Sequence, residues 1–245
     1  MEKANKIALL VDGDNARPKI LSLILEEASK YGKVTVRRIY GDWTSSHMNT
    51  WKGILNEMAF NPIQKFSYTT GKNSTDSALI IDAMDILHDE LVDGFCIVSS
   101  DSDYTGLAKR IREEGIFVMG IGEKKTPNAF VKSCEIFTFV ENLEVSEIVP
   151  VKDEKPVGKK QLKTATKAPV NMLLIDKAFN MSANESDEVN ISTLGINLRK
   201  LDPSFDCRTY GFKTLTSLFT KLPDFELVAR IVNGNNHPVL KRKGS

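Results

Sequence analysis

The sequence contains no apolar run that approaches the roughly 20 residues with which an α-helix crosses a membrane. It also lacks a signal-peptide cleavage pattern, because the apolar stretch near its amino terminus runs directly into the charged residue Asp12. We therefore expect a cytoplasmic protein that does not associate with membranes.

Cysteine and histidine are scarce, with three of each among 245 residues. Cys96, Cys134 and Cys207 lie far apart and form no CxxC pair, so we interpret them as buried thiols and expect neither a disulfide nor a zinc site. None of the histidines lies next to Asp12, Asp76, Asp101 or Asp103. Any bound metal ion is therefore expected to have oxygen ligands.

The sequence has no large excess of charge of either sign, since its formal net charge is +1. This balance neither indicates nor excludes binding to nucleic acid. Residues 1–143 carry 17 Lys and Arg against 20 Asp and Glu, whereas residues 144–245 carry 16 against 12. The acidic excess thus falls in the first part of the chain and the basic excess in the second.

Short apolar stretches alternate with helical patterns over residues 1–143. The predicted strands are 6–12, 34–40, 62–68, 95–99, 116–121 and 136–140. The main predicted helices, each with apolar residues at helical spacing, are 20–28, 51–58, 78–87 and 104–114. This alternation predicts an α/β domain with a doubly wound, mostly parallel sheet.

The remainder of the chain has a different composition. Residues 144–168 lose the periodic pattern and gain Lys, Pro and Thr, which predicts a charged linker. In residues 169–245, helical patterns lie at 170–179, 191–201 and 215–222. Two strand-like stretches follow them and can pair as a hairpin. This order predicts a small winged helix-turn-helix domain of the α+β class.

Acidic residues follow two of the predicted strands and begin one helix. Asp12 ends the first strand, and Asp101 and Asp103 come directly after strand 95–99. Asp76 falls in the first turn of the helix that precedes this strand. Because open α/β sheets bind ligands at the carboxyl ends of their strands, we expect the four carboxylates to converge there. A divalent cation would remove their mutual repulsion, and oxygen ligands favour Mg²⁺ or Mn²⁺ over Zn²⁺.

A metal ion held in this way suits the hydrolysis of a phosphodiester, because it orients the phosphate and activates a water molecule for in-line attack. We therefore predict that the metal ligands and catalytic residues are Asp12, Asp76, Asp101 and Asp103. The same acids also have a structural interpretation that remains open. Asp12 has the character of a turn former after a strand, and Asp101 that of a helix cap.

Three polar residues, each a few positions from one of these acids in the sequence, are candidate contacts to the substrate. We expect Asn15 and Ser100 to hydrogen-bond the scissile phosphate or an ordered water molecule. Lys72 is expected to lie over the product phosphate as a point charge.

Three segments carry a family resemblance, and they occur in order within residues 5–143: Val11–Asn15, Gly71–Asp76 and Val98–Tyr104. Through these segments, the region resembles the NYN domain, a PIN-like nuclease branch that includes the LabA/DUF88 proteins. The resemblance implies a PIN-like fold and metal-dependent ribonuclease activity. The site residues that the resemblance implies are Asp12, Asn15, Asp76, Asp101 and Asp103. A further acid of PIN-type sites, after the fifth strand, has only Glu123 as a counterpart here.

Residues 169–243 look like an OST-HTH/LOTUS domain, through the segments Leu194–Phe205 and Arg208–Leu215. This family is associated with RNA binding and sometimes with protein contacts. The predicted phosphate contacts are Arg199, Lys200, Arg208, Lys213, Lys241, Arg242 and Lys243. Tyr210 or Phe212 is a candidate for stacking on a base, with core packing as the alternative for Phe212.

Two other functions remain open. The stretch Asp12-Gly13-Asp14 also mimics the nucleophile and acid pair of haloacid-dehalogenase-type phosphatases, which form an aspartyl-phosphate intermediate. Ala16, however, stands where that family prefers Thr or Val. The other alternative is a catalytically idle RNA-binding or scaffold protein, since turnover depends on sub-ångström placement of the acids. No sequence pattern indicates the oligomeric state.

Overall fold

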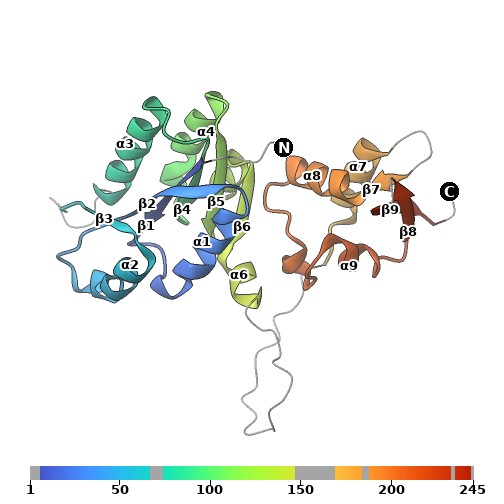
Figure 1. Ribbon diagram of the computed structural model, residues 1–245, viewed down its shortest axis with the longest axis horizontal. Helices are drawn as coiled ribbons and strands as arrows, with labels where there is room; N and C mark the ends of the chain where they lie inside the picture. Colours follow the sequence, from blue (N-terminus) through green and yellow to red (C-terminus); the bar gives the residue numbers. More distant parts are fainter. Residues whose placement is uncertain (1–5, 67–73, 147–168, 184–187, 233–234, 244–245) are drawn as a thin grey trace, which may run out of the picture. The chain divides into compact units, whose positions relative to one another are not determined.

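The computed structural model describes residues 6–66, 74–146, 169–183, 188–232 and 235–243 (Figure 1). The chain divides into two units, Met1–Glu144 and Val145–Ser245, and we describe each by itself. Almost all of the predicted linker, 144–168, lies outside the described residues.

The first unit is built on a six-stranded sheet with the strand order β3-β2-β1-β4-β5-β6. The strands are β1 (Lys6–Asp12), β2 (Lys33–Gly41), β3 (Asn61–Gln64), β4 (Gly94–Val98), β5 (Phe117–Gly122) and β6 (Ile136–Phe139). Every pair of neighbouring strands is parallel. The chain winds outward from β1 in one direction and from β4 in the other, which confirms the predicted doubly wound sheet.

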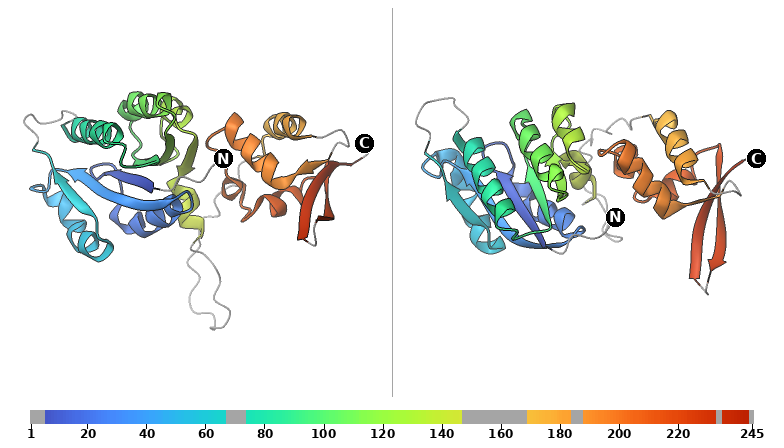
Figure 2. Two further views of the ribbon diagram at one scale, coloured as in Figure 1. Left: turned by 45° about the horizontal axis from the view of Figure 1, so that its top comes forward. Right: turned by 90° about the horizontal axis from the view of Figure 1, so that it is seen from above.

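Helices cover both faces of this sheet (Figure 2). The helices are α1 (Leu21–Ser29), α2 (Lys52–Met58), α3 (Ser74–His88), α4 (Thr105–Glu113), α5 (Asn128–Ser133) and α6 (Val140–Ser146). Alternate residues of β1 point to opposite faces, so Leu9 packs in one core with Ile24 of α1, and Leu10 in the other with Leu79 of α3. The sheet is therefore buried on both sides, and its polar groups lie at the ends of its strands.

Two elements differ from the sequence prediction. The third strand ends at Gln64 and not at residue 68. Helix α6 was not predicted, because its polar residues resemble the linker that follows. Val140 and Leu143, three positions apart on α6, are both buried in the core. Their burial explains why the helix forms there.

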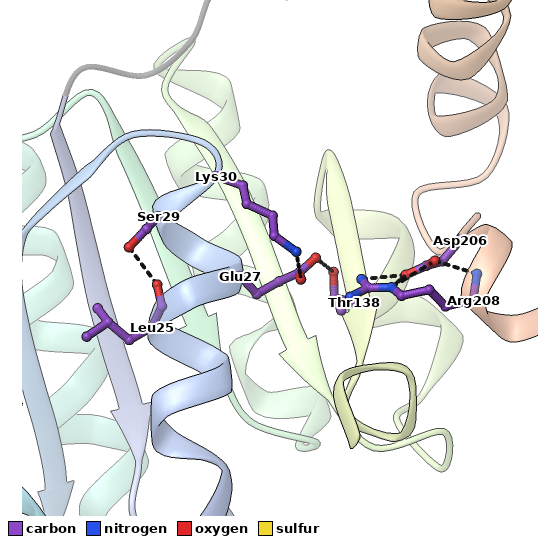
Figure 3. Close-up of polar contacts among 7 residues, drawn as sticks. All are labelled: Leu25, Glu27, Ser29, Lys30, Thr138, Asp206 and Arg208. Atoms are coloured by element: carbon purple, nitrogen blue, oxygen red, sulfur yellow. Dashed lines mark hydrogen bonds and ion pairs between the residues drawn. The ribbon is translucent and has the colours of Figure 1, made fainter. Parts of the chain in front are cut away.

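A buried carboxylate connects α1 to β6. Glu27 is 4% exposed and accepts hydrogen bonds from Lys30 Nζ at 2.7 Å and from Thr138 Oγ1 at 3.4 Å (Figure 3). These two donors compensate for the removal of the carboxylate from water. The hydrogen bond from Thr138 also joins α1 to the edge strand β6.

Within its described residues, the second unit combines three α-helices with a small antiparallel sheet of order β7-β9-β8. The elements are α7 (Met172–Ser182), β7 (Val189–Asn190), α8 (Ile191–Leu201), α9 (Leu215–Phe219), β8 (Phe225–Val232) and β9 (Asn235–Arg242). Its core contains Ile175, Phe179, Leu194, Leu198 and Phe219. The predicted α+β unit with three helices and a terminal hairpin is confirmed.

Local residues explain where the helices of this unit begin and how closely they pack. The side chains of Asn171, Asn190 and Thr214 cap α7, α8 and α9, and Thr214 forms a reciprocal capping box with Ser217. A Cβ atom on Gly195 would lie 2.7 Å from Leu215 Cδ1. Glycine at this position therefore allows α8 to approach α9.

Candidate metal centre and RNA-binding surface

The candidate site lies where the direction of winding reverses, between β1 and β4. Val11 pairs with Val98 in the register of these parallel strands, so Asp12 and Ser99 leave the sheet side by side. The chain then turns to α1 after one strand and to α4 after the other. Such a switch point leaves a crevice at the carboxyl ends of the strands.

Three of the predicted acids converge at this edge. Asp76, Asp101 and Asp103 each offer a carboxylate oxygen, and these atoms all lie within 4.8 Å of one another. We call these three residues the acid cluster. Asp76 comes from the first turn of α3, and the other two come from the segment after β4. No thiol or imidazole joins this group among the residues that the structure describes, and three convergent carboxylates fit a hard cation such as Mg²⁺ or Mn²⁺.

The backbone after β4 is held in place by its own side chains. Ser99 Oγ accepts a hydrogen bond from the Asp101 N–H at 3.1 Å, and Asp101 Oδ1 accepts one from the Asp103 N–H at 3.0 Å. Asp101 thereby caps a short 3₁₀ helix, η3 (Ser102–Tyr104). The structural interpretation of Asp101 as a cap is thus correct, and a carboxylate that caps with one oxygen retains a second one for a ligand.

Asp12 lies beside the acid cluster but has a different environment. It is 0% exposed, and its Oδ2 accepts from Asn15 Nδ2 at 2.8 Å and from Ser99 Oγ at 2.9 Å. Its Oδ1 accepts from the backbone N–H groups of Asp14 and Asn15. Burial raises the pKa of the Asp12 carboxyl, and the hydrogen bonds from Asn15 and Ser99 offset part of that shift. Its role as a direct metal ligand stays a prediction.

Asp76 receives a hydrogen bond that the sequence did not indicate. The hydroxyl of Tyr104, a side chain that is 0% exposed, donates to Asp76 Oδ1 at 2.7 Å. Burial raises the pKa of the Asp76 carboxyl, this hydrogen bond lowers it in part, and repulsion from Asp12 raises it further. The pKa of Tyr104 is raised far above its usual value, chiefly by burial, so its hydroxyl stays protonated and acts as a donor.

Two of the three predicted substrate contacts, Asn15 and Ser100, form hydrogen bonds within the protein. The side-chain amide of Asn15 donates a hydrogen bond to Asp12. Ser100 Oγ accepts a hydrogen bond from the Glu123 N–H at 2.9 Å. Lys72 lies outside the described residues. The Glu123 carboxylate forms ion pairs with Lys125 at 2.9 Å and with Arg17 at 3.9 Å, and it is not part of the acid cluster. The substrate roles of Asn15, Ser100 and Lys72 therefore stay predictions.

Two further aspartates attach α3 to the sheet. Asp14 Oδ2 accepts from Thr75 Oγ1 at 2.8 Å, which joins the turn after β1 to the first turn of α3. The helical spacing of Asp82 with Asp85 and Asp89 predicts a solvated stripe, and for Asp82 this prediction is wrong. Asp82 accepts from the Arg38 guanidinium and from the Tyr40 hydroxyl, both on β2. No sequence signal indicated these partners, because they lie more than 40 positions away.

The predicted RNA contacts of the second unit fall into two groups. Arg199, Lys200 and Lys213 are exposed, and none of them pairs with an acid among the residues that the structure describes. Arg208 instead binds Asp206 through two nitrogens, Nε to Oδ2 at 2.8 Å and Nη2 to Oδ2 at 2.6 Å (Figure 3). Its side chain is only 18% exposed.

Other basic and aromatic candidates of the second unit also have intramolecular partners. Lys241 forms an ion pair with Glu188 at 2.7 Å, and Arg242 pairs with Asp176 at 2.9 Å. The side chain of Phe212 packs against the core, as its alternative interpretation proposes. Tyr210 packs beside the same core, with its ring 5.9 Å from that of Phe205. The RNA contacts of all these residues stay predictions.

Comparison with known families agrees with this architecture. Residues 6–144, more than half of the chain, match the family model of the NYN domain, so the chain belongs to the NYN domain family. Residues 160–235 match the family model of the OST-HTH/LOTUS domain. The predicted pair of domains is thus confirmed, and it defines a nuclease-like protein with an RNA-binding module. A search of curated proteins finds no match.

Solved structures show weaker similarity. A protein of unknown function from Vibrio parahaemolyticus is 21% identical, with a TM-score of 0.48 over 57% of this chain and 95% of that one. An uncharacterized protein from Nitrosomonas europaea is 28% identical, with a TM-score of 0.31 over 40% of this chain and 94% of that one. We draw no conclusion from either similarity, because both TM-scores are below 0.5. Among the residues that the structure describes, no helix combines the length and apolar character needed to span a membrane.

Proposed function

We propose that this protein is a cytoplasmic ribonuclease that binds Mg²⁺ or Mn²⁺ at the acid cluster and hydrolyses phosphodiester bonds in RNA. The observation that carries the proposal is the convergence of Asp76, Asp101 and Asp103 within 4.8 Å at the switch point of an NYN domain. The raised pKa of Asp76 supports it, because burial and neighbouring acids destabilise the ionised carboxylate until a cation compensates.

Each residue of the site has a distinct task in this proposal. The acid cluster holds the cation, which when bound would stabilise charge on the phosphate and lower the pKa of a water molecule. Asp12 holds Asn15 and Ser99 through hydrogen bonds, and Ser99 in turn holds the backbone N–H of Asp101. No side chain needs to act as a nucleophile, because water attacks the phosphorus atom.

The second unit would recruit the RNA. Its exposed residues Arg199 and Lys200 lie in the last turn of α8, and Lys213 directly precedes the cap of α9. Since α8 and α9 pack closely through Gly195 and Leu215, these positive charges lie on neighbouring elements of one small unit. Charges of this kind bind phosphates without sequence preference and give binding that weakens steeply with salt.

The phosphatase alternative loses support at Asp12. Its chemistry needs an accessible Asp12 carboxylate as nucleophile. Here that carboxylate is 0% exposed and accepts hydrogen bonds from Asn15, Ser99 and two backbone N–H groups. Donors around both oxygens reduce nucleophilicity, so a structural and electrostatic role suits this residue better.

A specific observation favours the catalytically idle alternative. The Glu123 carboxylate is engaged by Arg17 and Lys125 and does not join the acid cluster. A site with three convergent acids holds one cation more readily than two, and a single cation is less able to stabilise both the attacking and the leaving oxygen. A site that holds a single cation is what we expect of a protein that binds metal and RNA without cleaving the RNA.

Incubation of labelled RNA with the full chain distinguishes these functions. We expect cleavage with Mg²⁺ or Mn²⁺, none with chelator, and loss of cleavage by Asp101→Asn with retention of RNA binding. The matched control is Asp85→Asn, which alters an exposed aspartate of α3 outside the acid cluster and should cleave like the wild type. Equal cleavage by Asp101→Asn and the wild type would identify a contaminating nuclease and leave the idle alternative ahead.

A further inference from the structure

We infer that Tyr104 is a positioning residue of the metal centre, whose buried hydroxyl orients the Asp76 carboxylate toward Asp101 and Asp103. The inference rests on the proposed function, because it assigns a task within the proposed cation site. It concerns a residue whose side chain is 0% exposed and does not belong to the acid cluster.

The first support is the way in which the hydroxyl joins the two segments that form the acid cluster. Tyr104 ends the same 3₁₀ helix, η3, that is capped by Asp101 and contains Asp103. Asp76 lies 28 positions earlier in the chain, in the first turn of α3. The hydrogen bond of 2.7 Å from Tyr104 to Asp76 therefore connects the first turn of α3 to the segment that carries Asp101 and Asp103.

The second support is that the donor is fixed and the acceptor is not. The ring of Tyr104 is 0% exposed and packs beside Phe130, with 6.2 Å between ring centroids. Core packing of this kind holds a side chain in one rotamer. Asp76 is only partly buried, so its carboxylate would otherwise rotate toward water. A rigid donor beside a rotatable ligand is how outer groups set ligand orientation at metal sites.

The third support concerns the direction of the hydroxyl proton. Tyr104 also lies beside Asp12, whose Oδ2 already accepts from Asn15 and Ser99. A phenol has a single proton to donate, and Asp76 Oδ1 at 2.7 Å receives it. Of the two acids beside this hydroxyl, Asp76 is the one that belongs to the acid cluster.

The chain offers a closely matched control for this residue. Tyr40 is also 0% exposed, belongs to the same core and donates its hydroxyl to an aspartate of α3, Asp82. Asp82 is not part of the acid cluster and also accepts from Arg38. Tyr40→Phe and Tyr104→Phe therefore each remove a hydroxyl from the same core, and each hydroxyl is bonded to an aspartate of α3. Only the second change affects a proposed ligand.

The test is a titration of Mn²⁺ into the full chain, followed by calorimetry, for the wild type, Tyr104→Phe and Tyr40→Phe. We expect Tyr104→Phe to weaken Mn²⁺ affinity by about tenfold, the lower end of the range for outer groups of metal sites. Tyr40→Phe should stay within about twofold of the wild type. Saturating Mn²⁺ should restore the RNA cleavage rate of Tyr104→Phe, which a general loss of structure would not allow.

A second set of variants tests whether Tyr104 acts through Asp76. In an Asp76→Asn background, adding Tyr104→Phe should cause no further loss of Mn²⁺ affinity, because the oriented carboxylate is already absent. A further loss of about tenfold in that background would overturn the inference. Melting temperatures of all variants confirm that the compared proteins are folded.

The outcomes separate this inference from the proposed function. Unchanged Mn²⁺ affinity in Tyr104→Phe, or an equal loss in Tyr40→Phe, overturns the positioning role and leaves ribonuclease activity intact. A selective loss of affinity in Tyr104→Phe without RNA cleavage by the wild type supports the positioning role and contradicts the ribonuclease. A wild-type chain that binds no Mn²⁺ overturns both.

Discussion

The two units differ in what holds their candidate functional residues in place. In the first unit, topology brings Asp12, Asp76 and the segment after β4 to one edge of the sheet, whatever their side chains contact. In the second unit, several basic residues expected at RNA are instead paired within the fold, as Arg208 is with Asp206. Backbone topology therefore predicts a site from sequence better than charge does, because an exposed and a paired arginine look alike in a sequence.

The largest effect should follow from removing a ligand of the acid cluster. Asp76→Asn keeps the shape of the side chain but removes its charge, and we expect RNA cleavage to fall by about 100-fold or more. Single-turnover cleavage at fixed Mn²⁺ measures this loss. Asp89→Asn, which changes an exposed aspartate directly after the end of α3, serves as the control. Comparable rates for Asp76→Asn and the wild type would remove the acid cluster from the mechanism.

The next effect tests whether Arg208 is a structural residue. Arg208→Ala leaves the Asp206 carboxylate, only 13% exposed, without its bidentate partner. We expect a loss of about 2 kcal/mol in the stability of the second unit, less than for a fully buried pair. Urea unfolding of the full chain, monitored through this unit, measures the loss. Unchanged stability together with weaker RNA binding would instead make Arg208 an RNA contact.

A pH effect distinguishes the buried acids of the first unit from ordinary surface acids. Burial raises the pKa of Asp12 and of Asp76 in the folded, metal-free protein. Between the ordinary and the raised pKa, the folded state holds more protons than the unfolded state, so stability falls as pH rises through this window. Mn²⁺ needs ionised carboxylates, and its stabilising effect should grow over the same window.

The measurement is the urea midpoint of the metal-free chain as a function of pH. Asp12→Asn should flatten the curve, because an amide does not titrate. An Asp12→Asn curve that keeps the full slope of the wild type would assign the pH dependence to other groups.

The smallest expected effect belongs to an exposed charge of the second unit. Lys200→Ala should leave stability within about 0.5 kcal/mol of the wild type, since Lys200 is exposed at the end of α8. RNA affinity should fall a few-fold, and the slope of its logarithm against that of salt concentration should decrease by about 1. Fluorescence anisotropy at several salt concentrations measures both. An unchanged salt slope would place the RNA elsewhere.

The sequence predicted what depends on pattern and position along the chain. Apolar periodicity predicted the strands and helices of the sheet, and the strand ends predicted where Asp101 and Asp103 lie. It did not predict α6, where the buried apolar residues that the structure describes, Val140 and Leu143, are too few to mark a helix among polar neighbours. It also missed the partners of Tyr104, because a tyrosine after an acidic turn has the same appearance whether its hydroxyl reaches water or Asp76.

The most direct test of the account is the position of Mn²⁺ in crystals of the full chain, located by anomalous scattering. We predict a peak within coordination distance of carboxylate oxygens from Asp76, Asp101 and Asp103, and loss of that peak in Asp101→Asn. The crystals are soaked at a Mn²⁺ concentration that supports RNA cleavage. No peak at the acid cluster, or a peak elsewhere, would show that the acid cluster does not hold the catalytic ion.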